Sequence, residues 1–306
     1  MKNISWIDFL KLRASWGIIN SDRIPSDGYW EQTYGKNQYY AFGSDYSLLD
    51  DQGWRKGTLA VGNSTHEKST KYNVGLDMSL FKGLNITADA YYERYSDIWV
   101  DASSKYSSVL GQTVPYENAG IVDAWGTEIG VDYTKRLGQV TINVGGTFSY
   151  ARNKVKDKLE KIQIYQNLVS TGLPVGQLFG LKAIGLFKDQ ADIDNSPKQT
   201  FSTVYPGDIK YEDVNGDNKI DANDVVAIGH GTTTPETYYT INLGAEWKGL
   251  GFTALFQGVG RYSSMLNAAG LYRPLMGKTS LSEYYYKNRW TVDNPNALFP
   301  RLSTQS

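Results

Sequence analysis

The chain has 306 residues, of which 41% are hydrophobic, so it is long enough to bury a sizeable core. It carries 31 basic and 32 acidic residues and a formal net charge of −1, which excludes the strong basic field typical of nucleic-acid-binding proteins. Cysteine is absent, which excludes disulfides, thiol nucleophiles and cysteine-ligated metals. No apolar run approaches the roughly 18 residues of a membrane-spanning helix, although barrel strands need only face lipid at every second residue.

Alternation of apolar and polar residues is the main structural signal. A first strand is predicted at 9–16, and a stronger pattern begins at Tyr72. Residues Tyr72, Val74, Leu76, Met78 and Leu80 are apolar, and the residues between them are small or polar. The alternation resumes after a short turn at 82–84 and continues to residue 95. This period of two predicts a β-hairpin formed by 71–81 and 85–95.

The same unit recurs twice. The pattern predicts hairpins at 127–135 with 140–153, and at 239–247 with 252–256. These strands run roughly 10 to 13 residues, longer than the 5 to 6 usual in soluble sheets and suited to a tilted strand that crosses a bilayer. Alternation alone fits a large soluble β-sandwich equally well.

The connections differ at the two ends of the hairpins. Short turns join the strands at one end, and long polar segments at 20–70, 97–124, 154–177 and 188–236 join them at the other. This asymmetry favours an outer-membrane barrel, which has short periplasmic turns and long outer loops. Aromatic residues near strand ends predict an interfacial girdle: Phe81, Tyr91, Tyr95, Trp99, Trp125, Tyr150, Tyr238 and Trp247. Carboxylates on the polar faces predict a wetted lumen: Asp77, Asp89, Glu128, Asp132 and Glu246.

Residues 213–224 resemble a calcium-binding loop. Oxygen ligands are expected at loop positions 1, 3, 5, 9 and 12, and a backbone carbonyl at position 7. The predicted ligands are Asp213, Asn215, Asp217, Lys219 through its carbonyl, Asp221 and Asp224. Position 6 is Asn218 where EF-hands use Gly, and position 12 is Asp where they use Glu, so weak binding of a structural Ca²⁺ is expected. The alternative is a solvated turn.

Catalytic motifs are missing from the sequence, and no organic cofactor is expected. There is no Gly-x-Ser-x-Gly elbow, no phosphate-binding glycine loop and no His-Glu-x-x-His. His66 and His230 lie in polar or glycine-flanked segments and are interpreted as surface residues. The chain is therefore predicted not to be an enzyme. Aromatic residues in the loops are predicted to pack against each other rather than to stack on sugar rings: Tyr29, Trp30, Tyr34, Tyr39, Tyr40, Trp54 and Tyr284 to Tyr286.

An ordered set of motifs resembles the SusC/RagA family of TonB-linked outer-membrane transporters. The motifs are the segments at 9–17, Asn118-Ala119-Gly120, 176–187, Pro206-Gly207-Asp208-Ile209-Lys210-Tyr211, 213–224 and Phe256-Gln257-Gly258-Val259-Gly260. Their order extends over nearly the whole chain. The resemblance implies an all-β, antiparallel transmembrane barrel of about 22 strands that surrounds an N-terminal plug.

On this basis residues 1–306 are expected to be the C-terminal barrel portion, with about seven to nine strands, long extracellular loops and an insertion at 213–224. The plug and the final strands are expected to be absent from this chain, and no signal peptide is recognised at its start. The resemblance implies TonB-dependent import of an oligosaccharide or peptide across the bacterial outer membrane, with a SusD-like surface lipoprotein, TonB and outer-membrane lipid as partners. The alternative is a secreted β-sandwich that binds glycans and carries a dockerin-like calcium loop.

Overall fold

The computed structural model describes most of the chain, as two compact units. The described residues are 6–24, 30–38, 41–42, 47–48, 53–62, 64–268, 270, 274–275 and 279–303. Unit 1 consists of Met1–Ile162, Thr171–Val175 and Pro235–Arg261, and unit 2 of Gln163–Ser170, Gly176–Thr234 and Tyr262–Ser306. No helix among the described residues is long and apolar enough to span a membrane.

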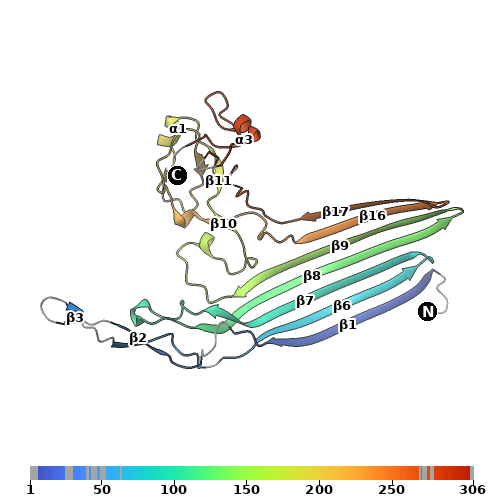
Figure 1. The fold of residues 1–306 in the computed structure, drawn as a ribbon, viewed down its shortest axis with the longest axis horizontal. Coiled ribbons are helices and arrows are strands. Elements are labelled where there is room, and N and C mark those ends of the chain that lie inside the picture. The colour runs from blue at the N-terminus through green and yellow to red at the C-terminus, as the bar shows by residue number, and fades with distance from the viewer. Residues whose placement is uncertain are drawn as a thin grey trace. The chain divides into compact units, whose positions relative to one another are not determined.

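Unit 1 is built on a seven-stranded antiparallel sheet (Figure 1). Its strands are β1 (Ile7–Ser21), β6 (Glu67–Leu80), β7 (Leu84–Asp101), β8 (Tyr116–Leu137), β9 (Val140–Asp157), β16 (Thr237–Trp247) and β17 (Leu250–Gly260). Each strand pairs with the next one of this series, so the sheet is a meander without crossovers. All three predicted hairpins and the predicted first strand are confirmed.

The strands are longer than the sequence pattern indicates. They contain 11 to 22 residues, because β7, β8 and β9 continue beyond the alternating core into segments predicted to be loops. The register shifts between Tyr95 and Trp99 on β7 and beside Ile121 on β8. A β-bulge breaks the period of two, which is why the alternation did not reveal these extensions.

Short turns close the three hairpins at one end of the sheet (Figure 1). Phe81 and Lys82 have φ values of 52° and 53° in the first turn, Gly138 has 63° in the second, and Lys248 and Gly249 have 48° and 84° in the third. Left-handed residues of this kind give two-residue turns the twist that matches the paired strands. The long connections leave from the opposite end. One of them carries β2 (Tyr34–Gln38) with β5 (Gly53–Lys56), β3 (Ala41–Phe42) with β4 (Ser47–Leu48), and another carries η1 (Ser108–Leu110).

Unit 2 is a small subdomain of short elements. It contains η2 (Gln166–Leu168), β10 (Phe179–Gly180), β11 (Ala183–Leu186), α1 (Gln190–Asp194), β12 (Lys198–Gln199), β13 (Ile209–Tyr211), β14 (Lys219–Ile220), η3 (Ala222–Asp224), β15 (Val226–Ala227) and α3 (Glu283–Asn288). Strands pair as β10 with β15, β11 with β13, and β12 in parallel with β14. Phe187, Ile220 and Tyr285 are its buried hydrophobic residues.

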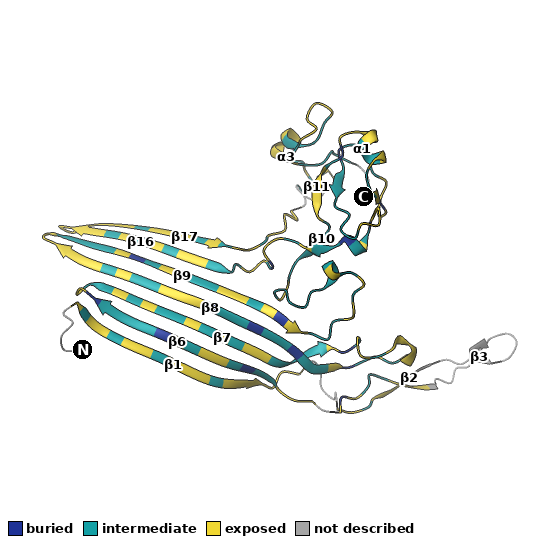
Figure 2. Ribbon diagram, turned by 180° about the vertical axis from the view of Figure 1, so that it is seen from behind, coloured by how far each residue is buried: buried dark blue, intermediate teal, exposed yellow. Residues whose placement is uncertain are grey.

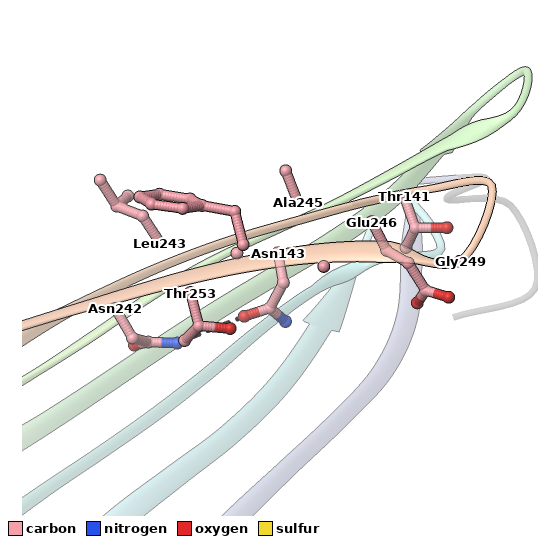
Figure 3. Close-up of a pocket in the computed structure, with 11 residues that line it drawn as sticks. Thr141, Asn143, Asn242, Leu243, Ala245, Glu246, Gly249 and Thr253 are labelled. Atoms are coloured by element: carbon pink, nitrogen blue, oxygen red, sulfur yellow. Dashed lines mark hydrogen bonds between the residues drawn. The ribbon is translucent and has the colours of Figure 1, made fainter.

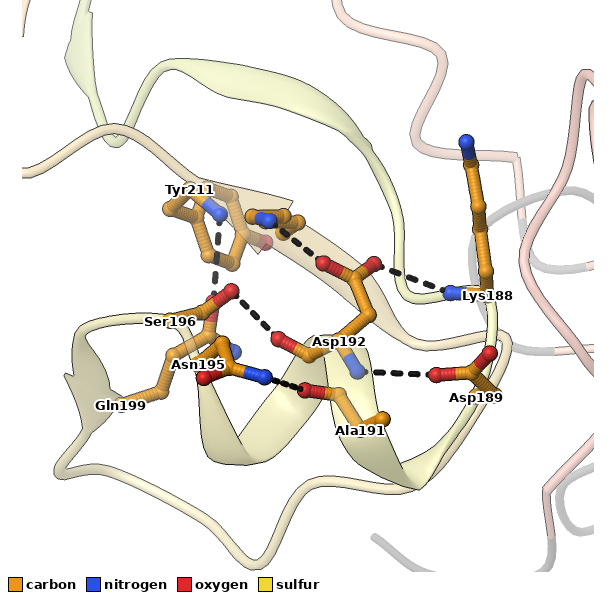
Figure 4. A network of polar contacts seen from close by, with 9 residues as sticks. Lys188, Asp189, Ala191, Asp192, Asn195, Ser196, Gln199 and Tyr211 are labelled. Atoms are coloured by element: carbon orange, nitrogen blue, oxygen red, sulfur yellow. Dashed lines mark hydrogen bonds and ion pairs between the residues drawn. The ribbon is translucent and has the colours of Figure 1, made fainter.

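A polar network fixes the helix α1 within unit 2 (Figure 4). Asp192 accepts hydrogen bonds from the Lys210 ammonium (2.8 Å) and from the backbone N–H of Lys188 (3.1 Å). Asp189 caps the helix by accepting the N–H of Asp192 at 2.8 Å. The bond from Lys210 is the main reason that the pKa of Asp192 is lowered.

Candidate functional site

One face of the unit 1 sheet is apolar and lies open. The pairing register places every second residue of all seven strands on this face, including Leu12, Val74, Ile129, Leu243 and Phe252. Leu12 is 75% exposed and Phe252 is 65% exposed, and exposed and intermediate residues alternate along the strands in Figure 2. A sandwich would bury this face under a second large sheet. The other sheets formed by the described residues are two-stranded, with strands of at most five residues, and are too small for that role.

Aromatic residues border the apolar band on both sides. Trp16, Tyr72, Tyr92 and Trp125 are direct cross-strand partners on β1, β6, β7 and β8. On the next two strands the border moves toward the turns, to Tyr150 and then to Tyr239, which is the stagger that tilted barrel strands produce.

The second border lies at the turn end. Tyr133 on β8 and Trp247 on β16 are each eight residues from the outer aromatic residue of the same strand, and Trp6 stacks on Phe81 at 5.9 Å. Eight residues correspond to roughly 26 Å along a strand. After a tilt of about 40° this projects to roughly 20 Å along the membrane normal, somewhat less than the apolar band of membrane barrels, about 25 Å tall.

The predicted girdle was therefore partly wrong. Trp125, Tyr150 and Trp247 lie on the apolar face, but Tyr91, Tyr95 and Tyr238 lie on the polar face. Position near a strand end does not reveal which face a residue occupies once the strands extend through bulges.

The opposite face is polar and carries a three-strand ion pair. The Arg13 guanidinium on β1 donates two hydrogen bonds of 3.0 Å to Asp77 on β6 and two more, of 3.0 and 2.9 Å, to Asp89 on β7. Gly75 lies between them, where a Cβ atom would come within 2.6 Å of Arg13. The sequence reasoning named both aspartates but missed Arg13. Arg13 could have been recognised from the sequence as a basic residue at a polar position of the predicted first strand.

All five predicted lumen carboxylates lie on this polar face. Besides Asp77 and Asp89 these are Glu128, Asp132 and Glu246, to which no ion pair is assigned within the described residues. Glu128 is opposite Asp89, and Arg13 offsets the repulsion expected between like charges on neighbouring strands. The face therefore combines carboxylates with amides and hydroxyls, as a water-filled lumen requires.

A hollow of about 430 Å³ is lined by residues of β9, β16 and β17 that come from both faces of the sheet (Figure 3). Gly244 and Gly251 supply no side chains there. Asn242 donates a hydrogen bond of 3.3 Å to Asn143, which donates one of 2.8 Å to Thr134. Leu243, Ala245 and Phe252 also line the hollow, so it combines amide, hydroxyl and carboxylate groups with apolar side chains.

The calcium-like loop of unit 2 adopts the expected backbone but not an assembled ligand set. Asn218 has a φ of 62°, a left-handed conformation that asparagine tolerates better than most residues do. Asp213 accepts the N–H groups of Gly216 (2.8 Å) and Asn218 (2.9 Å), and Asp217 accepts that of Lys219 (2.8 Å). Among the described residues no three acidic or histidine side chains gather as metal ligands do. Calcium binding stays a prediction.

Asp224, predicted as the last ligand, is fully buried in this loop. It accepts N–H groups from Val214 (2.9 Å), Asn215 (3.4 Å) and Asp221 (2.9 Å), and it completes a capping box with Asp221 at the start of η3. Asp221 itself accepts the N–H of Asn223 at 2.7 Å. These bonds satisfy backbone donors and hold the loop closed.

The histidines and loop aromatics give no catalytic arrangement. His66 and His230 are exposed in loops of different units. Tyr285 packs against Phe299 at 4.5 Å, as predicted for loop packing. In contrast, Trp30, Tyr34 and Trp54 are exposed, and Tyr29, Tyr39 and Tyr40 lie outside the described residues.

The Pro206-Gly207-Asp208 motif of unit 2 holds the end of the described chain. Gly207 has a φ of 88°, and a Cβ atom there would come within 2.5 Å of the Trp290 ring. Arg301 pairs with Asp208 at 2.7 and 3.3 Å and donates its backbone N–H to the Gly207 carbonyl at 3.0 Å. The motif is therefore a structural clamp.

The chain is similar in sequence to known receptor proteins. No protein-family model matches the chain. TonB-dependent receptor P26 of Formosa agariphila is 26% identical over 322 residues, which cover 100% of this chain and 31% of the receptor. TonB-dependent receptor P39 of the same organism is 26% identical over 271 residues, which cover 76% of this chain and 25% of the receptor. The resemblance to TonB-linked outer-membrane transporters is confirmed.

Solved structures agree with the receptor relatives on the fold. The RagAB peptide transporter matches with a TM-score of 0.65 at 19% identity, covering 100% of this chain and 32% of that chain. The RagAB peptide importer in the open-open state matches with a TM-score of 0.68 at 19% identity over the same shares. The chain thus spans about a third of the length of its relatives. Its predicted outer-membrane location is confirmed by the same similarities.

Proposed function

We propose that the chain forms part of the barrel wall and outer loops of a TonB-dependent importer. The observation that carries this proposal is the open apolar face, which continues across all seven strands and lies between aromatic borders. The acyl chains of lipids contact this face, because each exposed apolar side chain would otherwise contact water. Further strands complete the sheet, since lipid does not tolerate unpaired edges.

The polar face lines the lumen and meets the solute. Its amides, hydroxyls and carboxylates suit a polar nutrient, an oligosaccharide or a peptide. The similarity of the fold to RagAB, a peptide transporter, supports the peptide class. The exposed loop residues Trp30, Tyr34 and Trp54 suit stacking on sugar rings and support the oligosaccharide class. A SusD-like surface lipoprotein and TonB are the proposed partners, with TonB contacting a region outside this chain.

Cell fractionation and uptake test this function. The product of the intact gene is expected in the outer-membrane fraction, and recovery as a soluble periplasmic protein would contradict the proposal. Uptake of labelled peptides and of labelled oligosaccharides is then compared between the parent strain, a strain that lacks the gene and a strain that lacks TonB. Loss of uptake in both mutant strains identifies the transported class.

We also propose that the 213–224 loop binds Ca²⁺ in a structural role. Asp213 and Asn215 are partly buried and Asp217 is exposed, and a carboxylate that accepts one or two N–H groups keeps lone pairs for a cation. The ion would be held by these three side chains, the Lys219 carbonyl and Asp221, with Asp224 bracing the loop from inside. A hard cation suits this all-oxygen set.

A further inference from the structure

Basic residues lie on the apolar side of the sheet just beyond its outer aromatic border. Arg94 follows Tyr92 by two residues on β7, and Arg152 and Lys154 follow Tyr150 by two and four residues on β9. The pairing register places Arg94, Asp123 and Lys154 in one row across three adjacent strands. The cations therefore share the side of the sheet that carries Tyr92 and Trp125.

Their depth corresponds to the headgroup layer of a bilayer. Two and four residues span roughly 7 and 13 Å along a strand, or about 5 and 10 Å along the membrane normal after tilting. The polar layer on each side of the hydrocarbon core is about 5 to 7 Å thick, so the Cα atoms of Arg94 and Arg152 fall within it. The Cα atom of Lys154 lies beyond it, and the long lysine side chain can reach back to the headgroups. Since the long connections leave from this end, the layer is the one on the outer surface.

The charges of this cluster are only partly neutralised. Arg94 forms two hydrogen bonds with buried Asp123, at 2.7 and 3.0 Å, yet its side chain remains 48% exposed. Arg152 contacts Glu236 at 3.4 Å, and Glu236 is shared with Arg261 at 2.9 Å. Lys154 has no ion-pair partner assigned within the described residues. Each guanidinium has five N–H donors, so both arginines keep donors for a further anion.

We propose that Arg94, Arg152 and Lys154 bind the phosphate groups of outer-leaflet lipid headgroups. Arginine and lysine at the edge of an apolar band are the groups that recognise phosphorylated lipids. The two hydrogen bonds to buried Asp123 hold the Arg94 guanidinium in one orientation. The aromatic row below holds the acyl chains at the matching depth. The inference rests on the proposed wall function but goes beyond it, because a wall needs no specific lipid.

Lipid A with two phosphates is the probe, and its dephosphorylated form is the matched ligand. The full-length protein is purified from outer membranes in detergent, and binding is measured by native mass spectrometry. The parent is expected to prefer the phosphorylated form. The double variant Arg152→Gln, Lys154→Gln is expected to bind it about 25-fold more weakly, from about fivefold per cation.

Lys11→Gln is the control, because Lys11 is exposed on the polar face of β1 and its loss removes one positive charge from the other side of the sheet. Its binding is expected to equal that of the parent. Lys154→Arg is expected to keep binding, and the shift of the folded barrel on unheated gels shows that each variant is folded.

The outcomes separate the two proposals. Membrane-inserted protein that binds both lipid forms equally, or a double variant that binds like the parent, overturns the lipid site alone. Equal competition by inorganic phosphate overturns the assignment to a lipid. Protein that never reaches the outer membrane overturns the wall function and the lipid site together.

Discussion

Arg13 reaches Asp89 across an intervening strand, because Gly75 leaves the space between β1 and β7 empty. The same guanidinium holds Asp77, so one side chain ties three strands together on the polar face. A charge-assisted network of this kind depends on the absence of a single methyl group.

Gly75→Val is therefore expected to destabilise the barrel. The new side chain would displace the ends of Arg13 and Asp89 and break the ion pair between them, and loss of a partly exposed ion pair costs about 0.2–1 kcal/mol in the free energy of unfolding. Urea unfolding of the full-length protein in vesicles measures this change in the free energy of unfolding. Gly17→Val on β1 is the control, since a Cβ atom there meets nothing within 4 Å. Equal losses from both variants would contradict the role given to Gly75.

Ile129→Lys tests the assignment of the two faces. Ile129 lies midway between Trp125 and Tyr133 on the apolar face, so a lysine there is expected to cost about 2–4 kcal/mol of membrane-inserted stability. Glu128→Lys, one residue earlier, points a lysine into the lumen opposite Asp89 and should stay within about 0.5 kcal/mol. The same unfolding measurement compares them. A larger loss of stability from Glu128→Lys than from Ile129→Lys would contradict the assignment of the apolar face to lipid and of the polar face to the lumen.

Gly207→Ala should weaken the clamp of unit 2. Gly207 and Gly216 both have positive φ, of 88° and 75°, but only at Gly207 would an added methyl group meet a neighbour, the Trp290 ring, within 2.5 Å. Alanine at 216 is expected to cost the conformational penalty of about 1–2 kcal/mol, and alanine at 207 about 1–3 kcal/mol more. Limited proteolysis between residues 283 and 303 reports release of the segment, and it should increase only for Gly207→Ala.

Acid should loosen unit 2 through Asp192. Its pKa is lowered in the folded state, first by the hydrogen bond from Lys210 and then by the Lys188 N–H. The stabilisation is therefore fully present above the unfolded pKa, near 3.9, and is lost as pH falls through the lower folded value. The protection factors of residues 188–211 against hydrogen exchange, which compare the observed rate with the intrinsic rate at the same pH, should fall in this range. In Asp192→Asn the exchange should already be faster at pH 7 and should lose this acid dependence.

Asp217→Asn should lower the calcium affinity of the 213–224 loop, because it replaces a charged oxygen ligand by a neutral one. Isothermal titration calorimetry of the full-length protein with CaCl₂ measures the change. Glu212→Gln, which removes an adjacent charge outside the predicted ligands, is the control. Absence of any calcium heat in the parent would contradict calcium binding altogether.

The alternation in the sequence was sufficient for the hairpins and for most members of each face. A period of two assigns residues such as Val74 and Asp77 to opposite faces within one strand. It carries no information on which strand lies beside which, so the contact between Arg13 and Asp89 could not be predicted. The bulges on β7 and β9 likewise hid the outer strand ends. Asp123 lies in a segment predicted to be a loop, so the row that it forms with Arg94 and Lys154 could not be predicted either.

For the loop at 213–224, the spacing of the oxygen-bearing residues was sufficient to predict a loop, but it did not predict which backbone groups their side chains contact. The left-handed Asn218 follows from local turn chemistry. The burial of Asp224 accompanies the hydrogen bonds that it accepts from the N–H groups of Val214, Asn215 and Asp221, which spacing does not encode.

The meander order of the sheet has a consequence for how such a chain can diversify. Strands β9 and β16 are held together by continuous backbone pairing, although the whole of Lys158–Glu236 separates them in sequence. Closing a longer connection costs only roughly 0.6 kcal/mol for each doubling of its length. Mutation and insertion can therefore remodel residues 158–236 while β9 and β16 keep their pairing, so this connection can change faster in evolution than the sheet.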